Sequence, residues 1–410
     1  MSRGPRGRLV AAGVVTASLA GAAAAQTVDT HGARTFVVGM PRGGARVDRV
    51  NLGRSGQCAE ALPSSGLRIA WQTPFLGVSI SHAPLVDGAG TTFVVGGQGD
   101  VVAISHDGTE SWRASTGALQ PGPAALASDG SVVFVDSNGE AVSVRQGHQR
   151  WRRRFGRADA AHPAPLPLED GGVVVATSHE LALLDADGNE RARTALPEPA
   201  TAPLIAAQGH VIVVAGSGTV YSWTLGGELL RVGSFGAPVD QGAALADDHT
   251  LLAVTSAHTH LTALDLTRGT ATTRAVAAAG LWLGPPATSK GSAEMLWITQ
   301  TSELVVFLDP SGAELRRAVV ATRAPMLSPD GGPVAIVPPP RVPTIVDAAG
   351  TAAFVTTDGA GIVGGGAAEM VSDVCPAAGG GAAAGLAPLG RGAFVVACRA
   401  GSLVALSGQP

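Results

Sequence analysis

The chain lacks helical patterns and long apolar runs. Its 56 glycines and 27 prolines make up about a fifth of 410 residues, so a long helix would be interrupted repeatedly. No segment after residue 25 has sustained apolar positions at helical spacing or eighteen consecutive apolar residues. We therefore expect a chain built from strands, without a transmembrane span.

Charged residues and cysteines are also scarce. The net charge is −4, which argues against a nucleic-acid binder. There are three cysteines, none adjacent to another, and no Cys-x-x-Cys-His motif for haem attachment. These absences leave no local sequence signature for a redox cofactor.

A turn followed by a large or long side chain recurs about every forty residues, which indicates one repeated supersecondary unit. Each unit contains four short runs rich in Val, Ile, Phe or Thr, separated by Gly, Asp or Asn, a pattern typical of a small antiparallel sheet. The turn before the fourth run reads Asp-x-x-Gly at 185–188, 309–312 and 347–350. One position in the fourth run of each unit, called the slot below, is occupied in turn by Trp71, Trp112, Trp151, Ala192, Arg231, Thr273, Arg316 and Phe354.

Many four-stranded units at this period predict an all-β fold, a β-propeller of four-stranded antiparallel blades. Seven units are complete, the last twenty-odd residues supply three more strands, and the strand around Trp71 has no partners before it. Pairing the two ends gives eight blades and removes two exposed sheet edges. Seven blades are the alternative, if the fifth or seventh unit is not a sheet.

The stretch at about 355–385 contains two Gly-Gly-Gly runs with Ala-rich flanks, and we interpret it as a loop inserted into the propeller of residues 66–410. Cys375 lies in this stretch and Cys398 in a predicted strand of the last blade. A Cys375–Cys398 disulfide would fasten the loop. Cys58 is either an alternative partner or a free thiol, and the sequence leaves both open.

Residues 1–25 have a basic head, a short apolar body and small residues ending at Ala25, as in a secretory signal peptide. We expect cleavage near Ala25 and a periplasmic or secreted protein. Residues 26–65 show little periodicity and are interpreted as an irregular leader draped on the propeller.

The run Ala263–Gly269, the run Ala103–Trp112 and the Ala-Pro-Leu openings resemble the pyrroloquinoline-quinone (PQQ) type of quinoprotein-like, WD40-like propeller repeat. The resemblance covers about residues 66 to 408. It implies that Trp71, Trp112, Trp151 and Phe354 are structural residues that lock neighbouring blades together.

The family has two functional branches. One contains quinoprotein dehydrogenases that use PQQ and calcium, and the other contains non-enzymatic scaffolds of outer-membrane assembly. The dehydrogenases typically carry two adjacent cysteines over the quinone and long insertions around it, which this chain lacks. We expect no enzyme and no cofactor, but a monomeric scaffold that binds an unidentified envelope protein or peptide. A PQQ- or metal-dependent oxidoreductase with divergent site loops is the alternative.

Three local features were weighed as sites. His258 and His260 have a spacing that could bind a metal, and the turn at Asp247–Asp248 could bind calcium, but neither shows the further ligands a site needs. We therefore expect no metal site. The run Arg150, Arg152, Arg153 and Arg154 could form a rim that docks an acidic partner or lipid headgroups, or could protect a charged edge strand.

Overall fold

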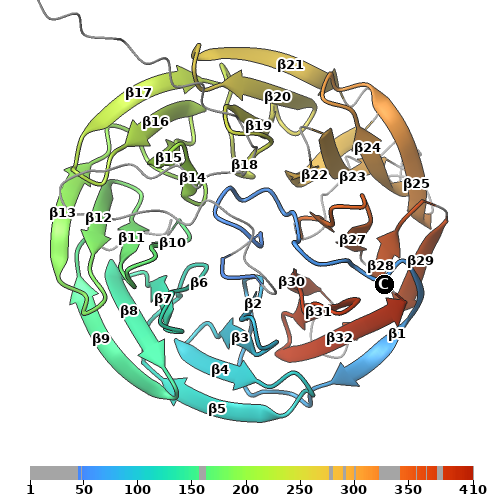
Figure 1. Cartoon of the computed structure of the whole chain (residues 1–410), viewed down its shortest axis with the longest axis horizontal. Coiled ribbons are helices and arrows are strands. Elements are labelled where there is room, and N and C mark those ends of the chain that lie inside the picture. The colour runs from blue at the N-terminus through green and yellow to red at the C-terminus, as the bar shows by residue number, and fades with distance from the viewer. Residues whose placement is uncertain are drawn as a thin grey trace, which may run out of the picture.

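The computed structural model describes residues 45–47, 49–156, 163–276, 280–289, 292–299, 302–322, 342–356, 358–365, 367–375 and 382–409. The expected signal peptide, residues 1–25, lies outside them. The described strands form eight four-stranded antiparallel sheets arranged around one axis (Figure 1). None of the described residues belongs to a helix long and apolar enough to cross a membrane.

Each blade runs from an innermost strand near the axis to a fourth strand on the rim (Figure 1). Blade 1 contains β2 (Leu85–Val86), β3 (Thr92–Val95), β4 (Asp100–Ile104) and β5 (Glu110–Ser115). Blade 2 contains β6 (Ala125–Leu126), β7 (Val132–Val135), β8 (Glu140–Arg145) and β9 (His148–Arg154). Blade 3 contains β10 (Leu166–Pro167), β11 (Val173–Ala176), β12 (Glu180–Leu184) and β13 (Glu190–Ala195). Blade 4 contains β14 (Ile205–Ala207), β15 (His210–Val214), β16 (Thr219–Trp223) and β17 (Leu229–Ser234).

The second half of the ring repeats this plan and then takes its last strand from the N-terminal side. Blade 5 contains β18 (Ala243–Leu245), β19 (Thr250–Thr255), β20 (His260–Asp265) and β21 (Thr270–Val276). Blade 6 contains β22 (Gly280–Ser289), β23 (Ser292–Thr299), β24 (Ser302–Leu308) and β25 (Glu314–Thr322). Blade 7 contains β26 (Ile345–Val346), β27 (Ala352–Val355), β28 (Gly359–Val363) and β29 (Ala368–Ser372). Blade 8 contains β30 (Ala383–Pro388), β31 (Ala393–Cys398), β32 (Ser402–Gln409) and β1 (Ser65–Gln72).

The hydrophobic core lies between neighbouring blades, because the middle strands are buried on both faces, as in β3 and β4 of blade 1. Between blades 1 and 2, Phe93 and Val101 pack in one cluster with Phe134 and Val142. The rim strands alternate between partly buried and exposed residues instead, as in β13. This alternation is what a strand covered on one face requires.

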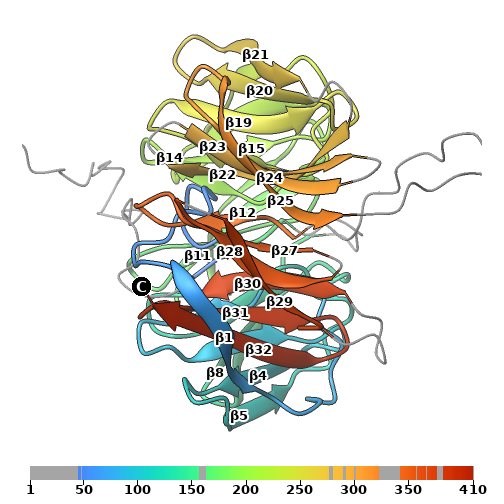
Figure 2. The same ribbon diagram turned by 90° about the vertical axis from the view of Figure 1, so that its right-hand side faces the viewer.

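Blade 8 is completed by a strand from early in the chain, where β1 pairs antiparallel with the C-terminal strand β32 (Figure 2). The indole Nε1 of Trp71 donates to the carbonyl oxygen of His106 in blade 1, at 2.9 Å. The ring lies against Gly108, whose φ of 89° and lack of a side chain allow this approach. A Cβ on Gly108 would stand 3.0 Å from the indole. Trp71 therefore fastens the closing blade to the first one.

The same contact recurs between other blades with different donors. Trp151 Nε1 donates to Ala186 O at 2.9 Å and Arg274 Nη1 to Pro310 O at 2.6 Å, and Arg316 Nη1 donates to Gly364 O in the turn between β28 and β29. Arg316 Nη2 also donates to Gly350 O, in the turn between the first two strands of blade 7, at 2.8 Å. Trp112 lies beside Gly147 and packs against Phe93, with 5.8 Å between ring centroids. In blade 5 the donor is Arg274 and not the predicted slot residue Thr273, because a bulge in β21 shifts the register by one residue.

The assignment of Phe354 to a fourth-strand slot was wrong. Phe354 lies in β27, the second strand of blade 7, and is fully buried. The Asp347–Gly350 turn that precedes it joins the first two strands, since the same turn signature serves both the first and the last hairpin of a blade.

The predicted inserted loop at 355–385 is also corrected, because β28 and β29, the last two strands of blade 7, lie within it. Gly361 in β28 faces the Phe354 ring, and a Cβ there would stand 2.6 Å from the ring. Gly361 therefore permits β28 to pack closely against β27, and residues 376–381 between β29 and β30 lie outside the described residues.

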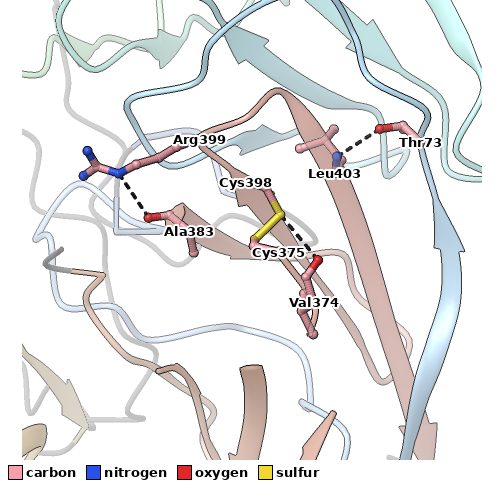
Figure 3. Close-up of a disulfide and its surroundings, with 7 residues drawn as sticks. All are labelled: Thr73, Val374, Cys375, Ala383, Cys398, Arg399 and Leu403. Atoms are coloured by element: carbon pink, nitrogen blue, oxygen red, sulfur yellow. Dashed lines mark hydrogen bonds between the residues drawn. A yellow bond between two sulfur atoms is a disulfide. The ribbon is translucent and has the colours of Figure 1, made fainter. Parts of the chain in front are cut away.

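The structure contains a Cys375–Cys398 disulfide, which joins the end of blade 7 to β31 of blade 8 (Figure 3). Cys58 is a free, fully buried thiol in the same hydrophobic cluster. Burial, with a smaller contribution from the nearby Asp347 carboxylate, raises the pKa of the Cys58 thiol above its ordinary range. The thiol is therefore neutral and unreactive at ordinary pH.

Candidate functional site

The segment of residues 45–62, called the hub below, lies at the centre of the ring (Figure 1). It passes inside the innermost strands and buries Val50, Cys58 and Leu62 almost completely. The expectation of a leader draped on the propeller is therefore corrected for this part of the chain. The reason is that its polar backbone finds partners on the axis that side-chain patterns do not reveal.

The hub follows the blades around the axis in chain order. Ala45 exchanges two main-chain hydrogen bonds with Val86 of blade 1, at 2.9 and 2.8 Å. Cys58 N donates to Val346 O of blade 7 at 2.7 Å. Between these ends, hub carbonyl groups accept from the innermost strands of blades 2, 4, 5, 6 and 7, through the amides of Leu126, Ala206, Leu245, Thr288 and Val346.

Arg54 extends the hub's contacts to blade 3. Its side chain is 0% exposed and its guanidinium donates to Leu204 O at 2.9 Å, Ala164 O at 3.2 Å and Pro165 O at 2.9 Å. Glu60 Oε2 accepts from Arg391 N of blade 8 at 3.1 Å. The hub thus contacts every blade among the described residues.

Arg49 makes a second buried contact of the same kind. Its guanidinium, 4% exposed, donates to the carbonyl groups of Ala243, Pro285 and Pro286 at the start of blades 5 and 6. A backbone φ of 64° turns the chain at Arg49 and aims the side chain outward from the axis. Both hub arginines are therefore held by main-chain carbonyl groups.

Proline explains why carbonyl groups gather here. A proline carries a carbonyl group but no N–H, so a stretch with many prolines offers more acceptors than donors. Prolines stand just before or within the innermost strands of most blades, at Pro84, Pro123, Pro165, Pro203, Pro285, Pro286 and Pro343. This ring of acceptors is suited to guanidinium groups.

A pocket of about 200 Å³ lies beside the hub, at what we call the mouth of the ring. Its polar lining comes from Arg49, Ser81, His82, Asp240 and Gln241. Ser81 and Asp240 are exposed, so the pocket reaches the surface, whereas Arg49 and Gln241 are buried.

His258 contacts two residues of the pocket lining, Asp240 and Gln241. Its Nε2 lies 2.9 Å from Asp240 Oδ2, and its Nδ1 contacts the Gln241 amide nitrogen. The turn Ser256–Ala257–His258 has three successive positive φ angles, of 53°, 51° and 72°. Such strain persists only where surrounding contacts impose it, and here those contacts position Asp240 and Gln241.

The two histidines weighed as metal ligands have separate roles. His258 contacts Asp240, while Nδ1 of His260 lies 2.8 Å from Thr259 Oγ1. Asp247 Oδ1 accepts hydrogen bonds from the backbone amides of His249 and Thr250 in its own turn, both at 2.8 Å. Within the described part of the chain, no group of three or more His, Cys, Asp or Glu side chains is positioned to hold a metal.

The arginine cluster on β9 is partly neutralised. Arg150 lies 3.2 Å from Asp129 and 3.9 Å from Asp187, and Arg152 lies 3.1 Å from Glu140. Arg153 and Arg154 are exposed. The cluster lies on a rim strand, and both interpretations of it, a docking rim and a protective charged edge, stay predictions.

Sequence reasoning did not find Arg49, Arg54, Asp240 or His82. The recurring Ala-Pro openings indicate the repeat in the sequence, but they do not indicate that the carbonyl groups beside them bind guanidinium groups. Their common position at the axis is a property of the closed ring, and nothing in the linear order assigns an arginine of the N-terminal segment to them.

A family model described as "Outer membrane protein assembly factor BamB" matches residues 48–160 and 140–279. The matched stretch, from 48 to 279, exceeds half of the chain. No curated protein shows a significant sequence match.

Solved structures with the same fold include BamB, an alcohol dehydrogenase and a designed protein. BamB from Moraxella catarrhalis superposes with a TM-score of 0.57 at 16% identity, covering 84% of this chain and 98% of that one. The quinohemoprotein alcohol dehydrogenase from Comamonas testosteroni has a TM-score of 0.62 at 12% identity, covering 90% and 82%. The computationally designed protein Ika8 has a TM-score of 0.62 at 12% identity, covering 83% and 99%. At such identities the likeness shows the fold alone.

Proposed function

This chain belongs to the PQQ-type propeller repeat family whose model is described as outer membrane protein assembly factor BamB, and on that premise we propose that it is a non-catalytic scaffold. It binds a protein or peptide partner in the cell envelope, after export and removal of residues 1–25. It acts as a monomer, with the mouth of the ring as the partner-binding face.

The observation that carries this proposal is the occupied centre of the ring. The hub fills the axis with its own main chain and two buried arginines. A pocket beside it, lined by residues that the structure describes, measures about 200 Å³. Sites for small molecules and cofactors usually span roughly 300–1,000 Å³. A small pocket on a rigid ring is better suited to one side chain of a partner than to a whole substrate with its cofactor.

The alternative is a PQQ- or metal-dependent oxidoreductase with divergent loops. An alcohol dehydrogenase shares the fold, so we give this alternative a test of its own. Purified protein would be incubated with PQQ and calcium and assayed for dye-linked oxidation of alcohols and sugars. Quinone binding with turnover would replace the scaffold proposal.

Site-specific photo-crosslinking in intact cells tests the scaffold directly. A photoreactive residue at Ser81, exposed at the mouth, should give a discrete crosslinked product whose partner mass spectrometry identifies as an envelope protein. The same residue at the exposed Asp107, in a turn near the rim, is the matched control. Equal crosslinking at both positions, or none at Ser81, would count against a partner-binding mouth.

The export part of the proposal has its own test. Mass spectrometry of the protein recovered from the envelope fraction should find an N-terminus near Gln26. An intact Met1 in a cytoplasmic fraction would contradict it.

A further inference from the structure

We propose that the mouth pocket is a binding site for a basic side chain, arginine or lysine, presented by the partner. This inference rests on the proposed scaffold function and adds the chemistry of recognition to it. The pocket would hold the cation between the carbonyl-rich starts of the innermost strands and the carboxylate of Asp240.

The ring already binds two guanidinium groups of its own. Arg54 is held by carbonyl groups at the start of blades 3 and 4, and Arg49 by carbonyl groups at the start of blades 5 and 6. All of these acceptors except Ala243 lie at or next to a proline, which has no N–H of its own. The starts of the innermost strands therefore form repeated sockets for cations.

The pocket lies where a further socket would be. Pro203, Pro285 and Pro343 line it, and they stand at the starts of blades 4, 6 and 7. It shares Pro285 and Ala243 with the contacts of Arg49. The pocket thus adjoins the carbonyl groups that hold Arg49, and it reaches solvent at Ser81 and Asp240.

Asp240 supplies the negative charge at the pocket's outer edge. Its side chain is 54% exposed, and Oδ2 lies 2.9 Å from His258 Nε2, which fixes the direction of the carboxylate. An approaching side chain meets this carboxylate before it meets the buried residues below. A carboxylate with a defined orientation favours a charge-assisted hydrogen bond with a cation.

The charge of Arg49 opposes a second cation in the pocket. Its guanidinium is buried, and its Nη1 and Nη2 groups donate to three carbonyl groups of blades 5 and 6. The negative charge of the exposed Asp240 carboxylate offsets the repulsion between Arg49 and a second cation. We therefore expect weak binding of a single residue, in the millimolar range, that weakens further with salt.

The test is a titration of the intact protein, followed by NMR or calorimetry, with N-acetyl-arginine amide and its neutral isostere N-acetyl-citrulline amide. The arginine derivative should bind about tenfold more tightly, because the isostere lacks the charge. Equal binding of the two, or no binding of either, would overturn the proposal. Tighter binding of N-acetyl-glutamate amide would assign the pocket to an anion and also overturn it.

Two matched variants locate the effect. Asp240→Asn removes the charge at the pocket and should weaken binding of the arginine derivative by about three- to fivefold. Asp248→Asn makes the same change in charge in an exposed turn and should leave binding unchanged. Equal effects of the two variants would contradict a local site. The wild-type comparison of the probes stands even if Asp240→Asn does not fold.

The outcome separates this inference from the scaffold function. If Ser81 crosslinks a partner equally in wild type and in Asp240→Asn, the partner binds without the proposed cation contact. If the arginine derivative binds but no partner crosslinks, the pocket is a cation site and the scaffold proposal fails.

Discussion

The ring is closed twice, on its rim by β1 and on its axis by the hub, and the two closures differ in how they hold the blades. On the rim, β1 completes the sheet of blade 8 and Trp71 reaches one neighbouring blade. On the axis, the hub contacts every described blade, through main-chain bonds, Glu60 and the buried guanidinium groups of Arg49 and Arg54.

The difference shows where stability is concentrated. Trp71 is half exposed, whereas Arg54 is fully buried and joins blades 3 and 4. Losing a rim contact loosens one junction between blades. Losing a hub contact leaves acceptors of several blades buried without donors, which is the costlier change.

The largest expected effect is therefore that of Arg54→Ala. Removing the guanidinium leaves the carbonyl groups of Leu204, Ala164 and Pro165 without this donor and creates a cavity. We expect a loss of about 3–5 kcal/mol in the free energy of unfolding, measured by urea denaturation. Arg46→Ala, an exposed arginine of the same segment, is the control and should cost less than about 0.5 kcal/mol. Similar losses for both variants would contradict the socket at Arg54.

Removal of the disulfide comes next. Cys375 and Cys398 are 23 residues apart and join blade 7 to blade 8, beside the rim closure. The double variant Cys375→Ala/Cys398→Ala should lose about 3 kcal/mol, because the unfolded chain gains freedom. Wild-type protein unfolded in the presence of a reducing agent should show the same loss. If neither the double substitution nor the reducing agent changes the free energy of unfolding, the disulfide does not form.

Trp71→Ala should have a smaller effect, of about 2 kcal/mol, since the indole is only half-buried and loses one hydrogen bond. Phe75→Ala, at a ring that is 72% exposed, serves as the control and should change the melting temperature little. A loss at Trp71 as large as that at Arg54 would remove the contrast between the two closures.

The smallest effect concerns the turn that receives Trp71. Hydrogen bonds from the side chains of Ser105 and Thr109 lower the pKa of Asp107 from 3.8 to about 2. A lowered pKa contributes stability that is present above 3.8 and is lost as the pH falls towards 2. Asp107→Asn should therefore have a flatter dependence of melting temperature on pH between 4 and 2. Identical profiles for the variant and the wild type would refute this contribution.

The rim closure could be predicted from the sequence, and the hub could not. Strands such as β1 and β32 have turn residues and β-favouring runs in phase with the repeat, so their pairing followed from completing a blade. Phe354 was misplaced because the Asp-x-x-Gly turn occurs in two hairpins of a blade. The hub has no periodic pattern, since it pairs through its backbone and its side chains face different blades.

Hydrogen–deuterium exchange over residues 45–62 tests the occupied axis most directly. The amides of Ala45, Gly56 and Cys58 donate to backbone carbonyl groups and should exchange as slowly as those of β31 in the core. The exposed residues Ala59, Glu60 and Ala61 should exchange rapidly in the same experiment. Rapid exchange throughout 45–58 would show that the hub does not fill the ring, and both the scaffold argument and the cation pocket would lose their basis.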